Sequence, residues 1–176
     1  MNNELQFGIQ TNGIKHTHLD PMPDIDHRFS MVKEAKVFDY VDKTPEQDEI
    51  ISFLKAKDKY QIPIKAGGWF YTVGEHKSLL KKNLLTAQNL GSTVHNTQIQ
   101  AINSDGNLVT NSEVRDVYLE AYDMAIKLGV TPCFEVHVNM WSEDFLRVTE
   151  VGNLVEEKGV EFNITLDHSH VIFKIN

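Results

Sequence analysis

The sequence contains little cysteine, proline or glycine. Its single cysteine, Cys133, excludes an internal disulfide framework, and because it lies in an apolar run we interpret it as a buried structural thiol, not a nucleophile. Only 5 prolines and 10 glycines occur among 176 residues, and no stretch concentrates them into a linker. With 41% hydrophobic residues, the chain can bury one sizeable core. We therefore expect a single domain over residues 1–176.

Long hydrophobic runs and basic residues are also scarce. No apolar run approaches the roughly 20 residues of a membrane-spanning helix, and the polar start Met1–Glu4 lacks the regions of a signal peptide. We expect a cytoplasmic protein without membrane association. The net charge of −8 argues against general nucleic-acid binding, which needs a basic surface. Lys77, Lys81 and Lys82 share one predicted helix, and we interpret them as a solvated helix face.

Short β-rich runs alternate with longer helical patterns along the chain. Helix signals include a start at Thr44–Gln47, with proline in the first helical position, and a capping box over Thr110–Glu113. Glycines at positions 91, 129 and 159 follow helical patterns and can end them. The six predicted strands are Leu5–Gln10, Val37–Val41, Ile62–Ala66, Thr93–Gln98, Thr131–Val138 and Phe162–Asp167.

This alternation with short connections predicts right-handed βαβ units and a parallel sheet, so the fold class is α/β. Polar residues at the carboxyl ends of several strands favour a (β/α)8 TIM barrel over a doubly wound sheet, and no G-x-G-x-x-G follows the first strand. Such a barrel takes about 250 residues, whereas this chain reaches about six βα units. We expect a truncated barrel, the amino-terminal part of a longer protein, with open sheet edges prone to association. A natural open sheet is the alternative.

The run Phe134–Val138 contains a carboxylate inside a predicted strand. Burying Glu135 without a partner would be unfavourable, and a divalent cation is one partner that would stabilise it. A glutamate held in this way can also move a proton, so Glu135 is the predicted catalytic residue. His137 shares its strand face, because side chains alternate, and is a candidate for substrate binding. A buried salt bridge is the structural alternative for Glu135.

Asp167 ends the next predicted strand, and His170 follows it after three residues. Neighbouring parallel strands lie about 5 Å apart, so the ends of these two strands can address one space. We predict that Glu135 and Asp167 bind one divalent ion there, and that His170 contacts either substrate or a second metal ion. The alternative is that Asp167 caps a helix and the histidines lie on the surface.

Further candidates come from other strands. His95, in the fourth strand, is predicted either to bind substrate or to be a satisfied core residue. Trp69 follows the third strand and can stack on a sugar or pack within its loop. Gln10 ends the first strand and could donate a hydrogen bond to a polyol. His16-x-His18 has the spacing of a barrel-hydrolase metal motif, but it comes too late after the first strand, so we interpret it as a loop.

Four segments together resemble the xylose isomerase-like TIM barrels, the superfamily of sugar isomerases and epimerases that also contains apurinic endonuclease IV. They are Phe134–His137, Leu166–His170, Val94–His95 and Phe7–Gln10. The resemblance follows the element order of the whole chain, and it implies that Glu135 and Asp167 bind a metal while His170 holds substrate or a further metal. The superfamily's other ligands, a histidine on strand seven and a glutamate on strand eight, have no counterpart in this sequence.

The resemblance implies a metal-dependent sugar or sugar-phosphate isomerase or epimerase. Mn²⁺ is the expected cofactor, with Zn²⁺, Co²⁺ or Mg²⁺ as alternatives, and a small sugar or sugar phosphate is the expected partner of a protein that can form homo-oligomers. Proton transfer through Glu135 beside a metal-bound carbonyl and a metal-mediated hydride shift would use the same ligands. Two alternatives stay open: an endonuclease IV-like phosphodiesterase, and a non-catalytic binding module derived from a barrel.

Overall fold

The computed structural model describes residues 5–11 and 23–175, so His16 and His18 lie outside the described residues. The strands are β1 (Gly8–Gln10), β2 (Tyr40–Asp42), β3 (Ile64–Ala66), β4 (Gly68–Tyr71), β5 (Val94–Ile99), β6 (Thr131–Val136) and β7 (Ile164–Leu166). The α-helices are α2 (Ile25–Ala35), α3 (Ile50–Tyr60), α4 (His76–Leu90), α5 (Asn111–Ala125), α6 (Phe145–Glu156) and α7 (His168–Ile175). Two short 3₁₀ helices, η1 (Ile126–Leu128) and η2 (Trp141–Glu143), complete the described elements.

The strands follow one another in space in their chain order. The pairings run β1-β2-β3 and β4-β5-β6-β7, and each pairing between these strands is parallel. Only Gly67 separates β3 from β4, and backbone hydrogen bonds from Thr93 N to Lys65 O (3.0 Å) and from Asn96 N to Gly67 O (2.7 Å) join both halves to the β5 segment. The described part of the chain therefore has six successive strand positions, which confirms the predicted α/β fold with a parallel sheet.

The segment after the predicted third strand is itself a strand. We expected Gly67–Tyr71 to follow the sheet as a loop, but Gly68–Tyr71 pairs residue by residue with Asn96–Ile99 as β4. The break at Gly67 has a steric reason, because a Cβ there would lie 2.5 Å from Thr44 Oγ1 and 2.7 Å from Thr44 N. Glycine allows the exit of β2 to approach this closely.

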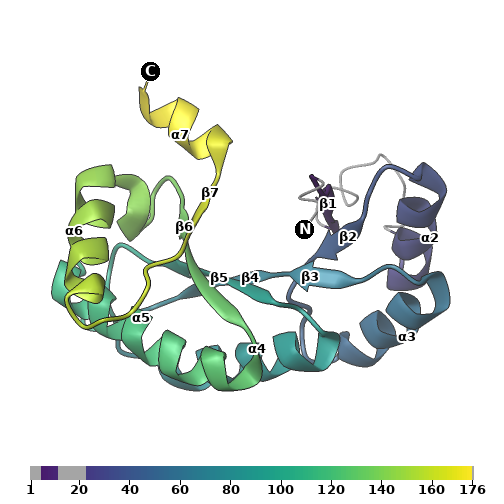
Figure 1. Ribbon diagram of the computed structural model, residues 1–176, viewed down its shortest axis with the longest axis horizontal. Coiled ribbons are helices and arrows are strands. Elements are labelled where there is room, and N and C mark those ends of the chain that lie inside the picture. The colour runs from purple at the N-terminus through teal and green to yellow at the C-terminus, as the bar shows by residue number, and fades with distance from the viewer. Residues whose placement is uncertain (1–4, 12–22, 176) are drawn as a thin grey trace.

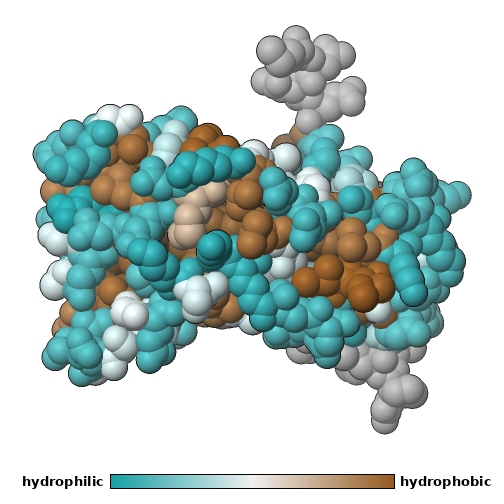
Figure 2. All heavy atoms as spheres, turned by 90° about the horizontal axis from the view of Figure 1, so that it is seen from below, coloured by the Kyte–Doolittle hydropathy of each residue, from teal (hydrophilic) through white to brown (hydrophobic). Residues whose placement is uncertain are grey.

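The helices cover one side of the sheet. Figure 1 shows α2 to α6 in an arc along the convex side of the curved sheet, while the concave side is open. This is the arrangement of a TIM barrel wall, with strands inside and helices outside. Figure 2, taken from the helical side, shows a largely hydrophilic surface with apolar patches. No helix within residues 5–11 and 23–175 is long and apolar enough to cross a membrane.

The apolar core lies between the sheet and the helices in two clusters. One cluster joins α2 and α3 to the first strands through residues such as Phe29, Val41 and Phe53. The larger cluster joins α4, α5 and α6 to β4, β5 and β6, with Leu84 and Phe134 among its fully buried members. Sheet curvature is thus fixed from its outer side, which leaves the polar inner residues free to form a site.

Local signals set most of the helix ends. The predicted capping box is present on α5, where Glu113 N donates to Thr110 Oγ1 (3.2 Å) and Thr110 N donates to Glu113 Oε2 (2.8 Å). Glycines 91, 129 and 159 adopt positive φ at or after helix ends, as expected. The predicted start at Thr44 is wrong, because α3 begins at Ile50 after Glu49. Thr44 instead lies buried against Gly67.

Candidate active site

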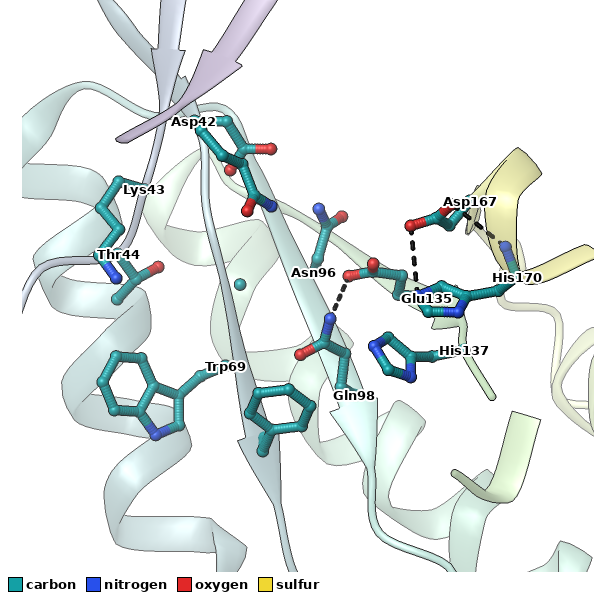
Figure 3. Close-up of a pocket in the computed structure, with 13 residues that line it drawn as sticks. Asp42, Lys43, Thr44, Trp69, Asn96, Gln98, Glu135, His137, Asp167 and His170 are labelled. Atoms are coloured by element: carbon teal, nitrogen blue, oxygen red, sulfur yellow. Dashed lines mark hydrogen bonds and ion pairs between the residues drawn. The ribbon is translucent and has the colours of Figure 1, made fainter. Parts of the chain in front are cut away.

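The described strands converge on one polar cavity at their carboxyl ends. Its volume is about 470 Å³, within the range of small-molecule sites. Every strand position contributes to it, either from its last residues or from the turn that follows. The lining residues are Gln10, Asp42, Lys43, Thr44, Gly68, Trp69, Phe70, Asn96, Gln98, Glu135, His137, Asp167 and His170. Figure 3 shows these side chains around the open inner side of the sheet.

Glu135 is the most deeply buried acid in the cavity. The register Thr97↔Phe134 sets Gln98 beside it, and Gln98 Nε2 donates a hydrogen bond of 2.6 Å to Glu135 Oε2. Only 9% of Glu135 is exposed. Burial raises the pKa of the Glu135 carboxyl, while the Gln98 hydrogen bond and His137 act in the opposite direction. A buried carboxyl with a raised pKa that lines a cavity is a candidate for proton transfer.

His137 is held by the turn that follows β6. Its backbone N–H donates to Ser142 Oγ (3.1 Å), and Ser142 Oγ in turn donates to the carbonyl of Glu135 (2.6 Å). In the ring, Nδ1 lies 2.7 Å from the carbonyl oxygen of Val138. A carbonyl only accepts, so Nδ1 carries the proton and the lone pair of Nε2 is left for another partner.

Asp167 and His170 come together where β7 leads into α7. Asp167 Oδ1 accepts hydrogen bonds from Ser169 N (2.8 Å) and Ser169 Oγ (2.6 Å), so this carboxylate caps α7. Its Oδ2 lies 3.4 Å from His170 Nε2. Burial tends to raise the pKa of Asp167, but the hydrogen bonds from Ser169 and His170 together lower it. Asp167 therefore caps a helix, as one alternative predicted, and also lines the cavity, as the other predicted.

The imidazoles of His137 and His170 face one another. Their ring centroids are 3.8 Å apart at an angle of 36°. His170 Nδ1 is buried and has no hydrogen-bond partner among the described residues. A buried imidazole nitrogen without a partner is the kind of group that a divalent ion or a substrate hydroxyl would satisfy.

The carboxylate and imidazole groups of Glu135, Asp167 and His170 are suitable ligands for a divalent ion, but the three side chains do not converge on one point. Within the part of the chain that the structure describes, no three His, Cys, Asp or Glu side chains form a group that could hold a metal ion. Glu135, Asp167 and His170 line the same cavity, and the carboxylate of Asp167 raises the pKa of Glu135 through like-charge repulsion. A cation between them would relieve this repulsion.

Two aromatic residues of β4, Trp69 and Phe70, line the cavity. Trp69, the predicted stacking residue, lines the cavity and also packs against the larger core cluster. Phe70 is 45% exposed, and its ring meets His137 edge-on at a centroid distance of 6.0 Å. The sequence interpretation missed Phe70, although the pairing Phe70↔Gln98 places it in the same cross-strand row as Gln98 and Glu135.

His95 does not reach the cavity lining. It is fully buried on the helix side of the sheet, where its Nε2 lies 2.7 Å from the hydroxyl of Tyr71. Burial lowers the pKa of His95 to about 4, so the ring is neutral at physiological pH. His95 is therefore a core residue, the second of its two predicted roles, and we do not include it in the site. Asp42, Asn96 and Gln98 also line the cavity and were missed. Asp42 ends β2, and Asn96 and Gln98 lie on one face of β5 because side chains alternate along a strand.

The parallel curved sheet, the helices on its outer side and the polar cavity at the strand ends define an α/β protein of the TIM-barrel class. More narrowly, the fold is that of the xylose isomerase-like TIM barrels, as solved structures of that kind show. Comparisons of the sequence with protein families and with curated proteins give no match.

Three of the similar structures are informative. A probable 3-DHS dehydratase, AsbF, from Bacillus anthracis has a TM-score of 0.70 at 11% identity over 97% of this chain and 65% of its own. A D-allulose 3-epimerase from Methylomonas sp., in complex with D-allulose, has a TM-score of 0.74 at 13% identity over 98% and 65%. The IOLI protein with a bound zinc atom has a TM-score of 0.64 at 13% identity over 92% and 62%. This chain spans about 65% of the length of the first two structures, and at these identities the similarity establishes the fold.

Proposed function

We propose that this chain provides the substrate- and metal-binding wall of a metal-dependent sugar isomerase or epimerase. The observation that carries the proposal is Glu135, a buried carboxylate that projects into the cavity and is held there by a single amide, Gln98. The fold is shared with a D-allulose 3-epimerase, and this supports a small sugar with adjacent carbonyl and hydroxyl groups as the substrate class.

In this proposal Glu135, Asp167 and His170 would supply part of the donor set of a divalent cation, with Mn²⁺ as the first choice. The cation would polarise a substrate carbonyl and make the adjacent C–H more acidic. Glu135 would remove or return the proton at that carbon as a general acid–base group. Gln98 fixes the carboxylate so that one oxygen stays directed at the cavity. His137 offers the lone pair of Nε2 to a substrate hydroxyl, and Phe70 covers an apolar face of the sugar.

A second candidate is binding without turnover. It is favoured by the lack of three converging metal donors among residues 5–11 and 23–175. A non-catalytic module of this kind would bind the sugar through the same cavity and leave its C–H bonds unchanged. The two candidates therefore differ in proton exchange and agree in ligand binding.

Proton exchange with solvent is the direct test. The 176-residue chain is incubated with D-allulose and Mn²⁺ in D₂O, and deuterium at the carbons beside the carbonyl is followed by NMR. We expect exchange with the natural chain and a loss of about 100-fold or more in Glu135→Gln, since general acid–base catalysis typically contributes that much. Glu156→Gln, an exposed change on α6, is the matched control and should exchange at the natural rate.

Each result has a clear meaning. An unchanged rate in a folded Glu135→Gln variant would refute the role of Glu135. Binding of D-allulose without any exchange by the natural chain would refute the isomerase proposal and favour the binding module.

A further inference from the structure

Asp42 is a third acid of the cavity besides Glu135 and Asp167, and it lies on a strand far from both. It is the last residue of β2, three strand positions from β6 around the curved sheet. Figure 3 shows Asn96 between Asp42 and Glu135, so the two carboxyl groups face the cavity from different walls. No role for Asp42 follows from the proton transfer described above.

The carboxylate of Asp42 has unused hydrogen-bonding capacity. Within the described residues, none donates a hydrogen bond to it, although the side chain is half-buried and lines the cavity. Its pairing with Gln10 on β1 places an amide beside it at the same level of the sheet. Burial raises the pKa of Asp42, and Lys43 only partly opposes this effect. A half-buried acceptor without a donor is satisfied when a ligand brings hydroxyl groups to it.

The charge balance of the cavity indicates the charge of the ligand that it can bind. Its described lining contains three carboxylates, Asp42, Glu135 and Asp167, against one lysine, Lys43, and no arginine. Sites for phosphate or carboxylate groups are usually built from arginine, lysine or helix amino-termini. Asp42 also raises the pKa of Glu135 through repulsion, so its field extends across the cavity. An anionic substrate group would meet the same repulsion.

We propose that Asp42 is a specificity-determining residue that accepts hydrogen bonds from the hydroxyl groups of a neutral sugar and repels phosphorylated analogues. The inference rests on the proposed function, because it assigns the far end of the same cavity to the part of the substrate that does not react. A neutral ketose then extends from Glu135 and Asp167 to Asp42 and Gln10, while a sugar phosphate is excluded by charge.

Calorimetric titration tests this with two probes, D-allulose and its 6-phosphate ester, at one fixed Mn²⁺ concentration and low ionic strength. The natural 176-residue chain should bind D-allulose at least about tenfold more tightly than the ester. Asp42→Asn keeps the shape and removes the charge, so it should weaken D-allulose about tenfold and strengthen the ester, since a hydrogen bond to a charged group is worth that much. Asp123→Asn, an exposed change on α5, should alter neither affinity.

The outcomes separate the two proposals. If D-allulose binds and Asp42→Asn changes neither affinity, or if the natural chain prefers the ester, the role of Asp42 is refuted while the proposed sugar chemistry stands. If D-allulose binds as predicted but shows no deuterium exchange, the role of Asp42 stands and the isomerase reaction fails. Binding of neither probe refutes both. Should Asp42→Asn not fold, Asp42→Ser replaces it with the same expected direction.

Discussion

Tyr71 is the centre of a buried polar network on the helix side of the sheet. Its hydroxyl accepts a hydrogen bond from Asn83 Nδ2 at 2.9 Å and lies 2.7 Å from His95 Nε2. The hydroxyl proton is therefore directed at Nε2, and the His95 proton resides on Nδ1, which has no hydrogen-bond partner among the described residues. Such a network is stable only while His95 stays neutral.

This predicts a pH dependence of stability that originates from one residue. Burial lowers the pKa of His95 from 6.5 to about 4, so between these values the unfolded chain binds a proton that the folded chain excludes. The free energy of unfolding should therefore fall as the pH falls through this window, by up to roughly 1.4 kcal/mol per pH unit. His95→Gln should remove this component, as measured by urea denaturation between neutral and acidic pH.

The exposed His27 on α2 provides the control for that measurement. His27→Gln should leave the slope of stability against pH as it is in the natural chain. An equal slope in the natural chain and in His95→Gln would show that His95 is not the source of the acid sensitivity.

At the scale of elements, the third strand position is split into β3 and β4 by the close approach of β2. The atoms nearest to a Cβ at Gly67 include backbone atoms of Lys43 and Thr44, which cannot move without shifting the strand exit. Thr44 itself lines the cavity. The close contact at Gly67 therefore fixes the position of Thr44, and with it part of the cavity lining.

Gly67→Ala should destabilise the fold by about 1–3 kcal/mol, the usual effect of overpacking, and should weaken sugar binding as Thr44 moves. Chemical denaturation gives the first quantity and calorimetry the second. Gly152→Ala on α6 is the matched comparison, because its Cβ would lie 3.1 Å from the ring of Phe162, a side chain that can shift. The gain in helix propensity there offsets the contact, so we expect little change. Equal effects of the two substitutions would contradict the steric account.

At the scale of the whole molecule, the described sheet has two edges, β1 and β7, with no strand paired on their far sides. Thr165 on β7 faces inward, where its hydroxyl donates to Asn96 Oδ1 at 2.6 Å. Ile164 and Leu166 point to the other face and are each 47% exposed. An open edge beside exposed apolar side chains is a typical site of self-association.

We therefore expect the 20.1 kDa chain to self-associate with rising concentration, as measured by analytical ultracentrifugation. The double variant Ile164→Lys and Leu166→Lys should shift the equilibrium toward the monomer, because charged residues protect sheet edges. Ile51→Lys, at a 66% exposed position on α3, should not. A natural chain that stays monomeric at all concentrations would contradict this expectation.

Local chemistry was enough for the sequence to determine the order of elements. The capping box at Thr110, the glycines after the helices and the apolar strand runs predict parallel βαβ units, and the structure has them. The sequence also predicts that Glu135 and Asp167 lie at the ends of neighbouring strands, since parallel strands end at one edge of a sheet.

Only the tertiary structure decided which side of each strand faces the cavity. Alternation divides the residues of a strand into two sets, but the packing of helices selects the buried set, which is why His95 lies in the core and Phe70 faces His137. The start of α3 at Ile50 instead of Thr44 has the same origin, because a local capping signal was outweighed by the contact with Gly67. The sequence therefore determined the elements and their polar ends, and long-range packing determined the walls of the site.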